Sequence, residues 1–242
     1  SRGLGDVYKR QMLKGIKLNI PDKTTMTPNG ALFRTDKKGF LPTMMEELYN
    51  ERVTYKKKML SAQQEFENTK DNKYKKLISR YNNIQMARKI SLNSAYGAIG
   101  NQYFRYYDKA IAEGITKSGQ LSIRWIENRL NKYLNNILKT DDDYVIASDT
   151  DSVYLTLDKL VTKTIKSDNA LSKTINFLDK VASESIEPYI TKSYDELKQY
   201  TNAFANKMFM KREVIADKGI WVAKKRYIPV SYTHLRAHET KA

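Results

Sequence analysis

Apolar residues along this chain follow two periods, and the change from one to the other divides it into predicted helices and strands. Long stretches repeat apolar residues every three to four positions, which is the spacing of one helix face. Shorter runs are rich in β-branched and aromatic residues and predict strands. The predicted helices run from Thr43 to a polar turn at 65–75, and then over 74–96, 108–138 and 169–200. The predicted strands are 144–147, 153–155, 207–215 and 220–228.

The first two helices predict an antiparallel pair, because a polar turn joins two long amphipathic segments. Thr43 and Glu46 have the spacing of a capping box at the start of the first helix. Gly97 and Gly100 predict the end of the second.

The third helix predicts much of the core. Its apolar stripe suits packing on a sheet, and Trp125 is expected to belong to that core. The stripe consists of Ile111, Ile115, Ile126, Leu130, Tyr133 and Ile137.

Helices combined with short antiparallel strands predict an α+β fold. Asp217-Lys218-Gly219 predicts the turn between the last two strands, and Pro229 predicts the end of the second. Pro188 predicts a kink or break in the last helix. The strands 144–147 and 153–155 predict a further hairpin.

The tip of that hairpin, Asp149-Thr150-Asp151-Ser152, carries the candidate chemistry. If the backbone stays extended, the carboxylates of Asp149 and Asp151 point to the same side. Two carboxylates aimed at one point repel each other unless a cation lies between them, and oxygen ligands suit Mg²⁺ or Mn²⁺. An ordinary acidic turn has the same spacing, so the motif alone leaves both interpretations open.

The charge of the chain favours a polyanionic partner. The 242 residues include 43 Lys and Arg against 27 Asp and Glu, a formal net charge of +16, which indicates nucleic acid first and a membrane surface second. A Lys- and Asn-rich genome would produce the same bias. The 17 tyrosines offer flat faces for bases. There is no cysteine, no apolar run of membrane-spanning length and no secretory signal, so we expect a cytoplasmic protein.

Three cations on the predicted helix pair form a candidate phosphate site. Arg52 and Lys56 are four residues apart and share a face, and the hairpin can bring Lys89 beside them. Three cations match a triphosphate that carries Mg²⁺. A solvated basic face continuing into Lys57 and Lys58 is the alternative.

Both ends of the chain lack a helix or strand period. Residues 1–11 and 231–242 resemble translated sequencing-adapter sequence, and we expect both to be non-native, with a fragment between them. His234 and His238 are four residues apart and could flank a metal on a helix, an interpretation that we do not adopt.

Three separated motifs resemble those of the family B DNA polymerases. Residues 88–97 (RKISLNSAYG) resemble motif B, residues 149–152 (DTDS) motif C, and residues 224–227 (KKRY) the Lys-Lys-x-Tyr motif. Residues 28–56 resemble the entry to the fingers. Residues 103–108 (YFRYYD) are similar to the tailed-bacteriophage branch.

The resemblance covers about residues 12–230. It implies an antiparallel palm sheet with packed helices that carries the acids, and a two-helix antiparallel fingers hairpin. Residues 12–42 would be a palm segment leading into the fingers at 43–100, and 101–230 would be palm with motif C and Lys-Lys-x-Tyr.

The activity implied is template-directed addition of deoxynucleotides to a DNA primer 3′ end by two-metal phosphoryl transfer. Asp149 and Asp151 match the catalytic residues that bind two Mg²⁺ or Mn²⁺ ions. The nucleotide-binding positions are Arg52, Lys56, Lys89, Asn93 and Tyr96, the DNA-binding positions are Lys224, Lys225 and Tyr227, and Gly97 and Glu213 are accessory.

The partners implied are primer–template DNA, deoxynucleoside triphosphates and a sliding clamp bound through a C-terminal region, in viral replication in a host cytoplasm. One departure from the family is Ala147-Ser148, where a Tyr-Gly pair usually precedes the acids. Motif A, which supplies a further metal-binding Asp, is expected before residue 12, so we expect this chain alone not to polymerise.

A non-catalytic, basic nucleic-acid-binding protein that keeps the polymerase fold is the alternative. The paired acids count against it, because they repel the DNA backbone. An RNA-directed polymerase is disfavoured because those enzymes usually place adjacent acids in the turn.

Overall fold

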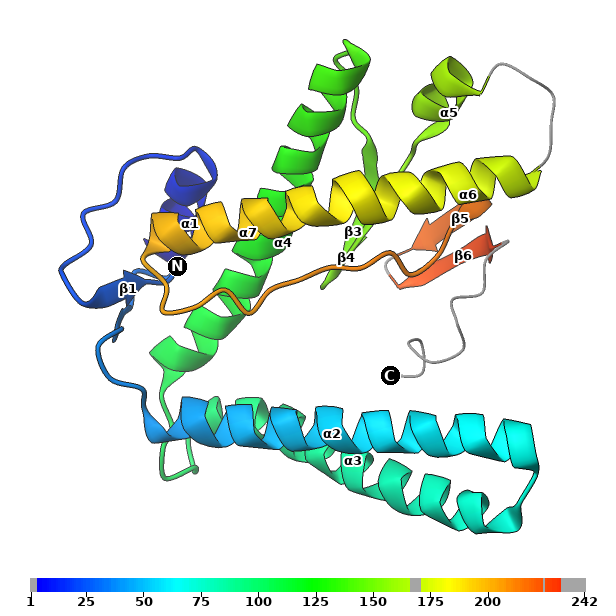
Figure 1. Cartoon of the computed structure of the whole chain (residues 1–242). Coiled ribbons are helices and arrows are strands. Elements are labelled where there is room, and N and C mark those ends of the chain that lie inside the picture. Colours follow the sequence, from blue (N-terminus) through cyan, green and yellow to red (C-terminus); the bar gives the residue numbers. More distant parts are fainter. Residues whose placement is uncertain (1–3, 166–170, 224, 232–242) are drawn as a thin grey trace. The chain divides into compact units, whose positions relative to one another are not determined.

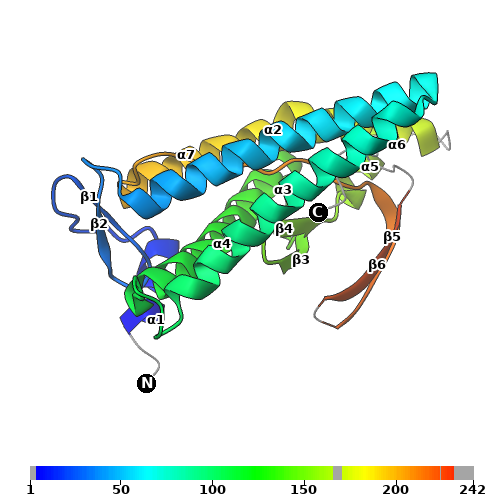
Figure 2. The ribbon, with the colours of Figure 1, turned by 90° about the horizontal axis from the view of Figure 1, so that it is seen from below.

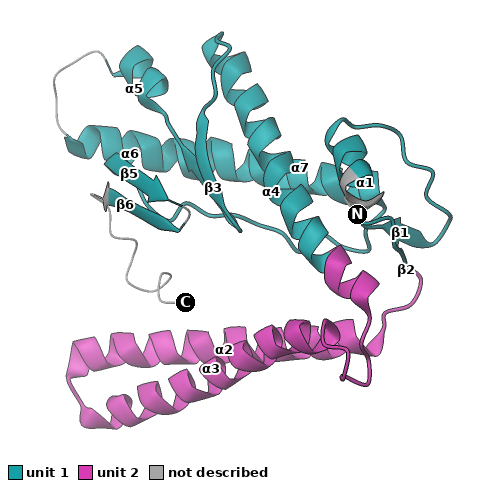
Figure 3. Cartoon of the chain, turned by 180° about the vertical axis from the view of Figure 1, so that it is seen from behind, with its two compact units in different colours: residues 1–33, 115–242 teal, residues 34–114 magenta. Residues whose placement is uncertain are grey.

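A computed structural model describes residues 4–165, 171–223 and 225–231 of the chain (Figure 1). It divides into two compact units, residues 34–114 and residues 1–33 with 115–242 (Figure 3). Long helices and small antiparallel sheets confirm the predicted α+β class. Within the described ranges, no helix is long and apolar enough to cross a membrane.

The unit of residues 34–114 contains the predicted antiparallel helix pair (Figure 2). Helices α2 (Phe40–Thr69) and α3 (Asn72–Ile99) are both longer than predicted, and only Lys70 and Asp71 separate them. The turn lies within the polar stretch 65–75, as predicted, but it is shorter than that stretch because both helices continue into its polar residues. The chain reverses where Lys70 takes a left-handed φ of 56° and Asp71 caps α3.

The predicted capping box at the start of α2 is wrong. The helix begins after Gly39, and the Thr43 hydroxyl donates to the Gly39 carbonyl at 2.9 Å from inside the first turn. Glu46 forms an ion pair with Lys38. Pro42 is tolerated here because the N–H groups of a first turn have no intrahelical partner.

Helix α4 (Lys109–Leu138) confirms the predicted helix over 108–138. Asp108 caps it, with Oδ1 accepting from the backbone N–H groups of Ala110 at 2.8 Å and Ile111 at 3.1 Å.

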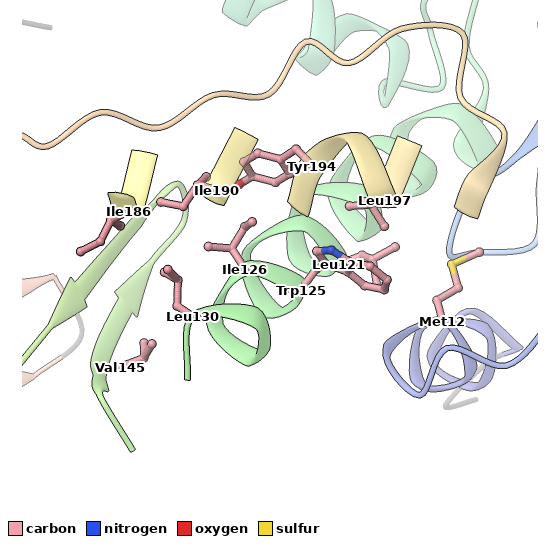
Figure 4. Packing of buried hydrophobic residues seen from close by; sticks show 10 residues of the cluster. All are labelled: Met12, Leu121, Trp125, Ile126, Leu130, Val145, Ile186, Ile190, Tyr194 and Leu197. Carbon is pink, nitrogen blue, oxygen red and sulfur yellow. The ribbon is translucent and has the colours of Figure 1, made fainter. Parts of the chain in front are cut away.

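The core of the larger unit forms where side chains of α4 and α7 (Glu187–Thr201) point toward one another (Figure 4). Trp125 is buried there, as predicted, and its Nε1–H donates to the Ser193 carbonyl at 2.9 Å. The buried cluster contains Met12, Leu121, Trp125, Ile126, Leu130, Val145, Ile186, Ile190, Tyr194 and Leu197.

The predicted apolar stripe of α4 is wrong toward its ends, since Ile115 and Ile137 are 49% and 52% exposed. The buried positions in the second half are Leu130, Leu134 and Leu138. Leu130 was predicted correctly, whereas Leu134 and Leu138 lie one residue, or about 100° around the helix, from the predicted Tyr133 and Ile137.

The long helical segment before the last hairpin contains a wide turn. Helix α6 (Leu171–Val181) passes through a π-helical turn (Ala182–Ile186) into α7, so the predicted break falls just before Pro188. The wide turn accommodates the proline, which cannot donate an i→i−4 hydrogen bond. Helix α5 (Asp158–Thr164) was not predicted.

The strands form three separate two-stranded antiparallel sheets in the described residues, rather than one continuous palm sheet. The pairs are β1 (Thr24–Met26) with β2 (Leu32–Arg34), β3 (Val145–Asp149) with β4 (Ser152–Leu155), and β5 (Ala216–Ala223) with β6 (Arg226–Ser231).

The last hairpin corrects several predictions. Residues 207–215 form no regular strand, and Asp217-Lys218-Gly219 lies within β5. Pro229 pairs with Gly219, and β6 continues beyond it to Ser231. A proline fits this position because the N–H groups of an edge strand need not all donate to a partner strand.

At the start of the chain, α1 (Leu4–Leu13) is helical, although no period was found in residues 1–11. Met12 at its end is fully buried in the core. The adapter-like end that holds His234 and His238 lies, from residue 232 on, outside the described residues.

Candidate functional site

The predicted acidic hairpin is confirmed. Strands β3 and β4 pair in antiparallel register up to Asp149 opposite Ser152, which leaves Thr150 and Asp151 as the turn. The backbone is not extended between the acids, because Thr150 has a φ of 54° and the Asp151 N–H donates to the Asp149 carbonyl at 2.6 Å. The predicted alternation of side chains therefore does not apply, and the turn itself sets the carboxylate directions.

Two hydroxyl side chains at the turn donate hydrogen bonds to Asp149. Ser152 Oγ donates to the Asp149 carbonyl at 3.1 Å, and Thr150 Oγ1 donates to Asp149 Oδ1 at the same distance. Asp151 is exposed and Asp149 is half-buried.

The two carboxylates fit a magnesium or manganese ion. Neither forms an ion pair with any residue in the described ranges, so their mutual repulsion is not offset by a described cation. The described residues contain no group of three His, Cys, Asp or Glu that could hold a metal by themselves. Mg²⁺ characteristically binds through one or two carboxylates, waters and substrate phosphates, and two acids therefore suffice for it.

The charges of these acids contribute to the raised pKa values of two tyrosines, the half-buried Tyr154 and the buried Tyr194, which the sequence analysis did not name as site residues. Burial and an interaction with the Tyr227 side chain raise the pKa of Tyr154 to about 12, with a smaller contribution from the charge of Asp149. Burial, followed by the charge of Asp151, raises the pKa of Tyr194 to about 12. Tyr194 lies at helical spacing from Ile190, which is a core signal and gives no hint of the acids.

The basic hairpin β5–β6 has its turn at the KKRY segment, not a strand passing through it. Lys225 is an exposed turn residue with a φ of 62°, while Lys224 lies outside the described residues. Tyr227 pairs with Trp221 across the strands, and both rings contact Tyr154 of β4. The structure thus brings one predicted DNA-binding residue, Tyr227, to the acidic hairpin.

The predicted accessory acid Glu213 is exposed in the irregular segment before β5. Its neighbour Arg212 pairs with Asp179 at 2.5 Å and donates its backbone N–H to Glu187 Oε1 at 2.9 Å. Among the described contacts, none joins Glu213 to the acidic hairpin.

In the other unit, the predicted phosphate-binding cations lie on two helices that contact each other. Glu51 on α2 pairs with Arg88 on α3 at 2.5 Å, so the helix segments that carry Arg52 and Lys89 adjoin. Lys56 follows Arg52 one turn along the same face. Unlike Arg88, these three half-buried cations form no ion pair with a described carboxylate.

Arg52 gives the strongest sign that this face accepts an anion. Its Nε is buried and has no hydrogen-bond partner within the described residues. A buried guanidinium N–H without an acceptor is destabilising, and a phosphate oxygen would satisfy it.

The remaining predicted nucleotide-binding residues lie near the end of α3. Asn93 and Tyr96 are exposed there, and Gly97 lies inside the helix, so Gly100 alone is the predicted glycine that ends it. A Cβ on Gly97 would meet no atom within 4 Å. The fingers-like cations and the acids belong to different units, residues 34–114 and residues 1–33 with 115–242.

Comparison with known proteins identifies the class to which this arrangement belongs. Residues 7–241 match the family described as DNA polymerase family B. The chain belongs to DNA polymerase family B.

Named relatives are consistent with that family. The chain is 34% identical over 257 residues to the DNA-directed DNA polymerase of Escherichia phage RB69, a match that covers 85% of this chain and 28% of the relative. It is 32% identical over 260 residues to that of Enterobacteria phage T4, covering 85% and 29%. The DNA polymerase delta catalytic subunit of Candida albicans is 34% identical over 137 residues, covering 54% and 12%. The chain therefore spans less than a third of the length of either phage relative.

Proposed function

We propose that this chain supplies the fingers and part of the palm of a polymerase that adds deoxynucleotides to a DNA primer on a DNA template. The observation that carries the proposal is the acidic hairpin tip, where Asp149 and Asp151 lack a described cation. Residues 43–100 would be fingers, and 12–42 with 101–230 would be palm.

In this proposal the acidic residues bind metal ions and the basic residues bind the triphosphate. Asp149 and Asp151 would hold two divalent ions, and Arg52, with its unsatisfied Nε, would bind the triphosphate together with Lys56 and Lys89. When bound, Mg²⁺ or Mn²⁺ lowers the pKa of the primer 3′-hydroxyl and stabilises the pyrophosphate that leaves.

The remaining groups position the substrates. Asn93 and Tyr96 would lie near the incoming nucleotide and the new base pair. Lys224, Lys225 and Tyr227 would hold the primer–template backbone, by phosphate contacts that position the duplex without reading sequence. We further propose that the polymerase binds a sliding clamp and acts in the cytoplasm of a host cell.

A chimera provides the test. Residues 12–230 would replace the matching segment of the phage RB69 polymerase, with Asp149→Asn as the test variant and Asp141→Asn as the control. Asp141 is an exposed acid of the same unit with no described contact to the site. We expect primer extension from the parent chimera and the control, and a fall on the order of a thousandfold in Asp149→Asn, because a neutral amide cannot hold the metal.

DNA binding separates the alternatives. Retained primer–template affinity in Asp149→Asn would show that the loss is chemical. A parent chimera that binds DNA and does not extend it, with affinity raised by Asp149→Asn, would favour the non-catalytic binding protein. The 242-residue chain alone is expected to give no robust extension.

A further inference from the structure

The acidic and basic hairpins are joined through one aromatic side chain. Tyr154 on β4 makes edge-to-face contacts with Trp221, at 5.5 Å between ring centroids, and with Tyr227, at 5.1 Å. Trp221 and Tyr227 are direct partners across β5–β6. Two residues that are paired across β5–β6 therefore both contact the ring of Tyr154 on the acidic hairpin.

The same tyrosine also connects to the acids. The Tyr154 side chain interacts with those of Tyr227 and Ser152, and Ser152 Oγ donates to the Asp149 carbonyl at 3.1 Å. A continuous series of contacts thus runs from Tyr227, in the KKRY segment, to the main chain of Asp149.

The basic hairpin needs such a contact. An isolated two-stranded hairpin is marginally stable in water. Its orientation relative to the acidic hairpin therefore depends on contacts with the rest of the unit. The face of β5–β6 opposite Trp221 is exposed, with Ile220, Val222 and Ile228 at 66%, 77% and 71%. The rings of Trp221 and Tyr227, on the other face, therefore provide a contact between this hairpin and the acidic one.

We propose that Tyr154 is a positioning residue, which sets the separation between the acids at one hairpin tip and the basic turn at the other. This inference rests on the proposed function, because it places the primer backbone held by the KKRY segment at a fixed distance from the metal-binding acids. A small error in the position of the reacting groups lowers the rate of the chemical step. The ring contacts of Tyr154, called the joint below, should therefore affect kcat.

Double electron–electron resonance (DEER) on the 242-residue chain can measure the distance between the tip of the acidic hairpin and the turn of the basic hairpin. The chain has no cysteine, so nitroxide labels would attach only at Thr150→Cys and Lys225→Cys, one exposed turn residue on each hairpin. We expect one narrow distance population in this labelled background.

Variants of Tyr154 test the joint. Tyr154→Leu removes both ring pairs and should lower the ratio of docked to undocked hairpin by on the order of tenfold, visible as a second, broader population. Tyr154→Phe keeps the ring and should keep the narrow population. Tyr133→Leu is the matched control, because it removes a stacked pair with Tyr189 (4.1 Å) between α4 and α7.

Several results would overturn the proposal. These are a broad population in the background chain, a Tyr154→Leu population as narrow as the background, or equal broadening in Tyr133→Leu. If Tyr154→Leu does not melt cooperatively, Trp221→Leu replaces it as the test variant. It removes the Tyr154–Trp221 ring pair from the other hairpin, and the same outcomes then support or refute the proposal.

Kinetics in the chimera connect the joint to turnover. Tyr154→Leu should lower kcat for extension at saturating DNA more than it raises the Kd for primer–template, with Tyr154→Phe close to the parent. Normal kcat in a variant with an undocked hairpin would refute the positioning role. The distance measurement does not depend on DNA synthesis, so a chimera without any extension would refute the proposed function and leave the joint itself tested.

Discussion

The hydroxyl of Tyr194 gives a sharp prediction, because it is buried without a hydrogen-bond partner in the described structure. Tyr194 is 2% exposed in the core between α4 and α7. Tyr144 is also 2% exposed, but its hydroxyl lies 2.6 Å from Thr140 Oγ1. The two tyrosines form a matched pair that differs in whether the hydroxyl is satisfied.

Substitution by phenylalanine should therefore have opposite effects at the two positions. An unsatisfied buried donor costs about 1–3 kcal/mol, so Tyr194→Phe should raise the free energy of unfolding by about that amount. For a chain of this size, each kcal/mol raises Tm by roughly 2–4 °C. Tyr144→Phe loses a satisfied hydrogen bond and should lower the free energy of unfolding by about 0.5–1.5 kcal/mol.

Alkaline pH should widen the gap between Tyr194→Phe and the parent chain. The pKa of Tyr194 is raised from its ordinary 10 to about 12, so the folded state holds the phenolic proton more tightly than the unfolded state. The resulting stabilisation is complete below pH 10 and is lost as the pH rises through 12. By pH 11 the parent should have lost about 1.4 kcal/mol that the phenylalanine variant does not lose.

Urea unfolding at pH 7, 9, 10 and 11 would measure these differences. Comparison between variants at each pH cancels the titration of the many lysines. The reasoning would be refuted if Tyr194→Phe were less stable than the parent at pH 7, or if the gap stayed constant to pH 11. The first result would show that the hydroxyl is satisfied in solution, and the second would show that folding does not raise its pKa.

Three further predictions concern other parts of the chain. Asp108→Ala removes the N-cap of α4 and should lower the free energy of unfolding by about 1 kcal/mol in a thermal melt. Trp125→Phe loses the bond to the Ser193 carbonyl and should cost about 1 kcal/mol in urea. Arg52→Lys should weaken deoxynucleoside triphosphate binding about tenfold by calorimetry, because the planar guanidinium is lost, whereas Arg80→Lys on the exposed surface of α3 should not change it.

Elements with a strong local signal were predicted well from sequence. Helix α4 has a long apolar period and a capping aspartate, and its bounds were predicted to within a residue. The acidic hairpin was found because a polar tip separates two β-branched runs. In both cases, residues that are close in sequence determine the element, so a local pattern is enough to predict it.

Elements set by tertiary contacts were not predicted. The turn of the last hairpin was placed at Asp217-Lys218-Gly219, a good turn sequence, but that segment lies within β5 and the hairpin closes where Ala223 pairs with Arg226. The register that places Trp221 opposite Tyr227 lets both rings meet Tyr154, and that contact joins residues distant in sequence. For the same reason, no local pattern showed that the charge of Asp151 acts on Tyr194, or that Tyr154, in the predicted strand after the acids, contacts the last hairpin.

The π-helical turn at Ala182–Ile186 makes the loss of one residue tolerable at one place in the helix. Within a regular α-helix, each residue added or removed rotates everything beyond it by about 100°. A π-helical turn holds one residue more than an α-helical turn, so a single deletion within Ala182–Ile186 would convert it to a regular turn and leave Ile190, Tyr194 and Leu197 facing the core. The same deletion inside α7 would rotate the side chains that follow it away from the core. When related sequences are aligned, a one-residue gap in this helix therefore belongs at 182–186.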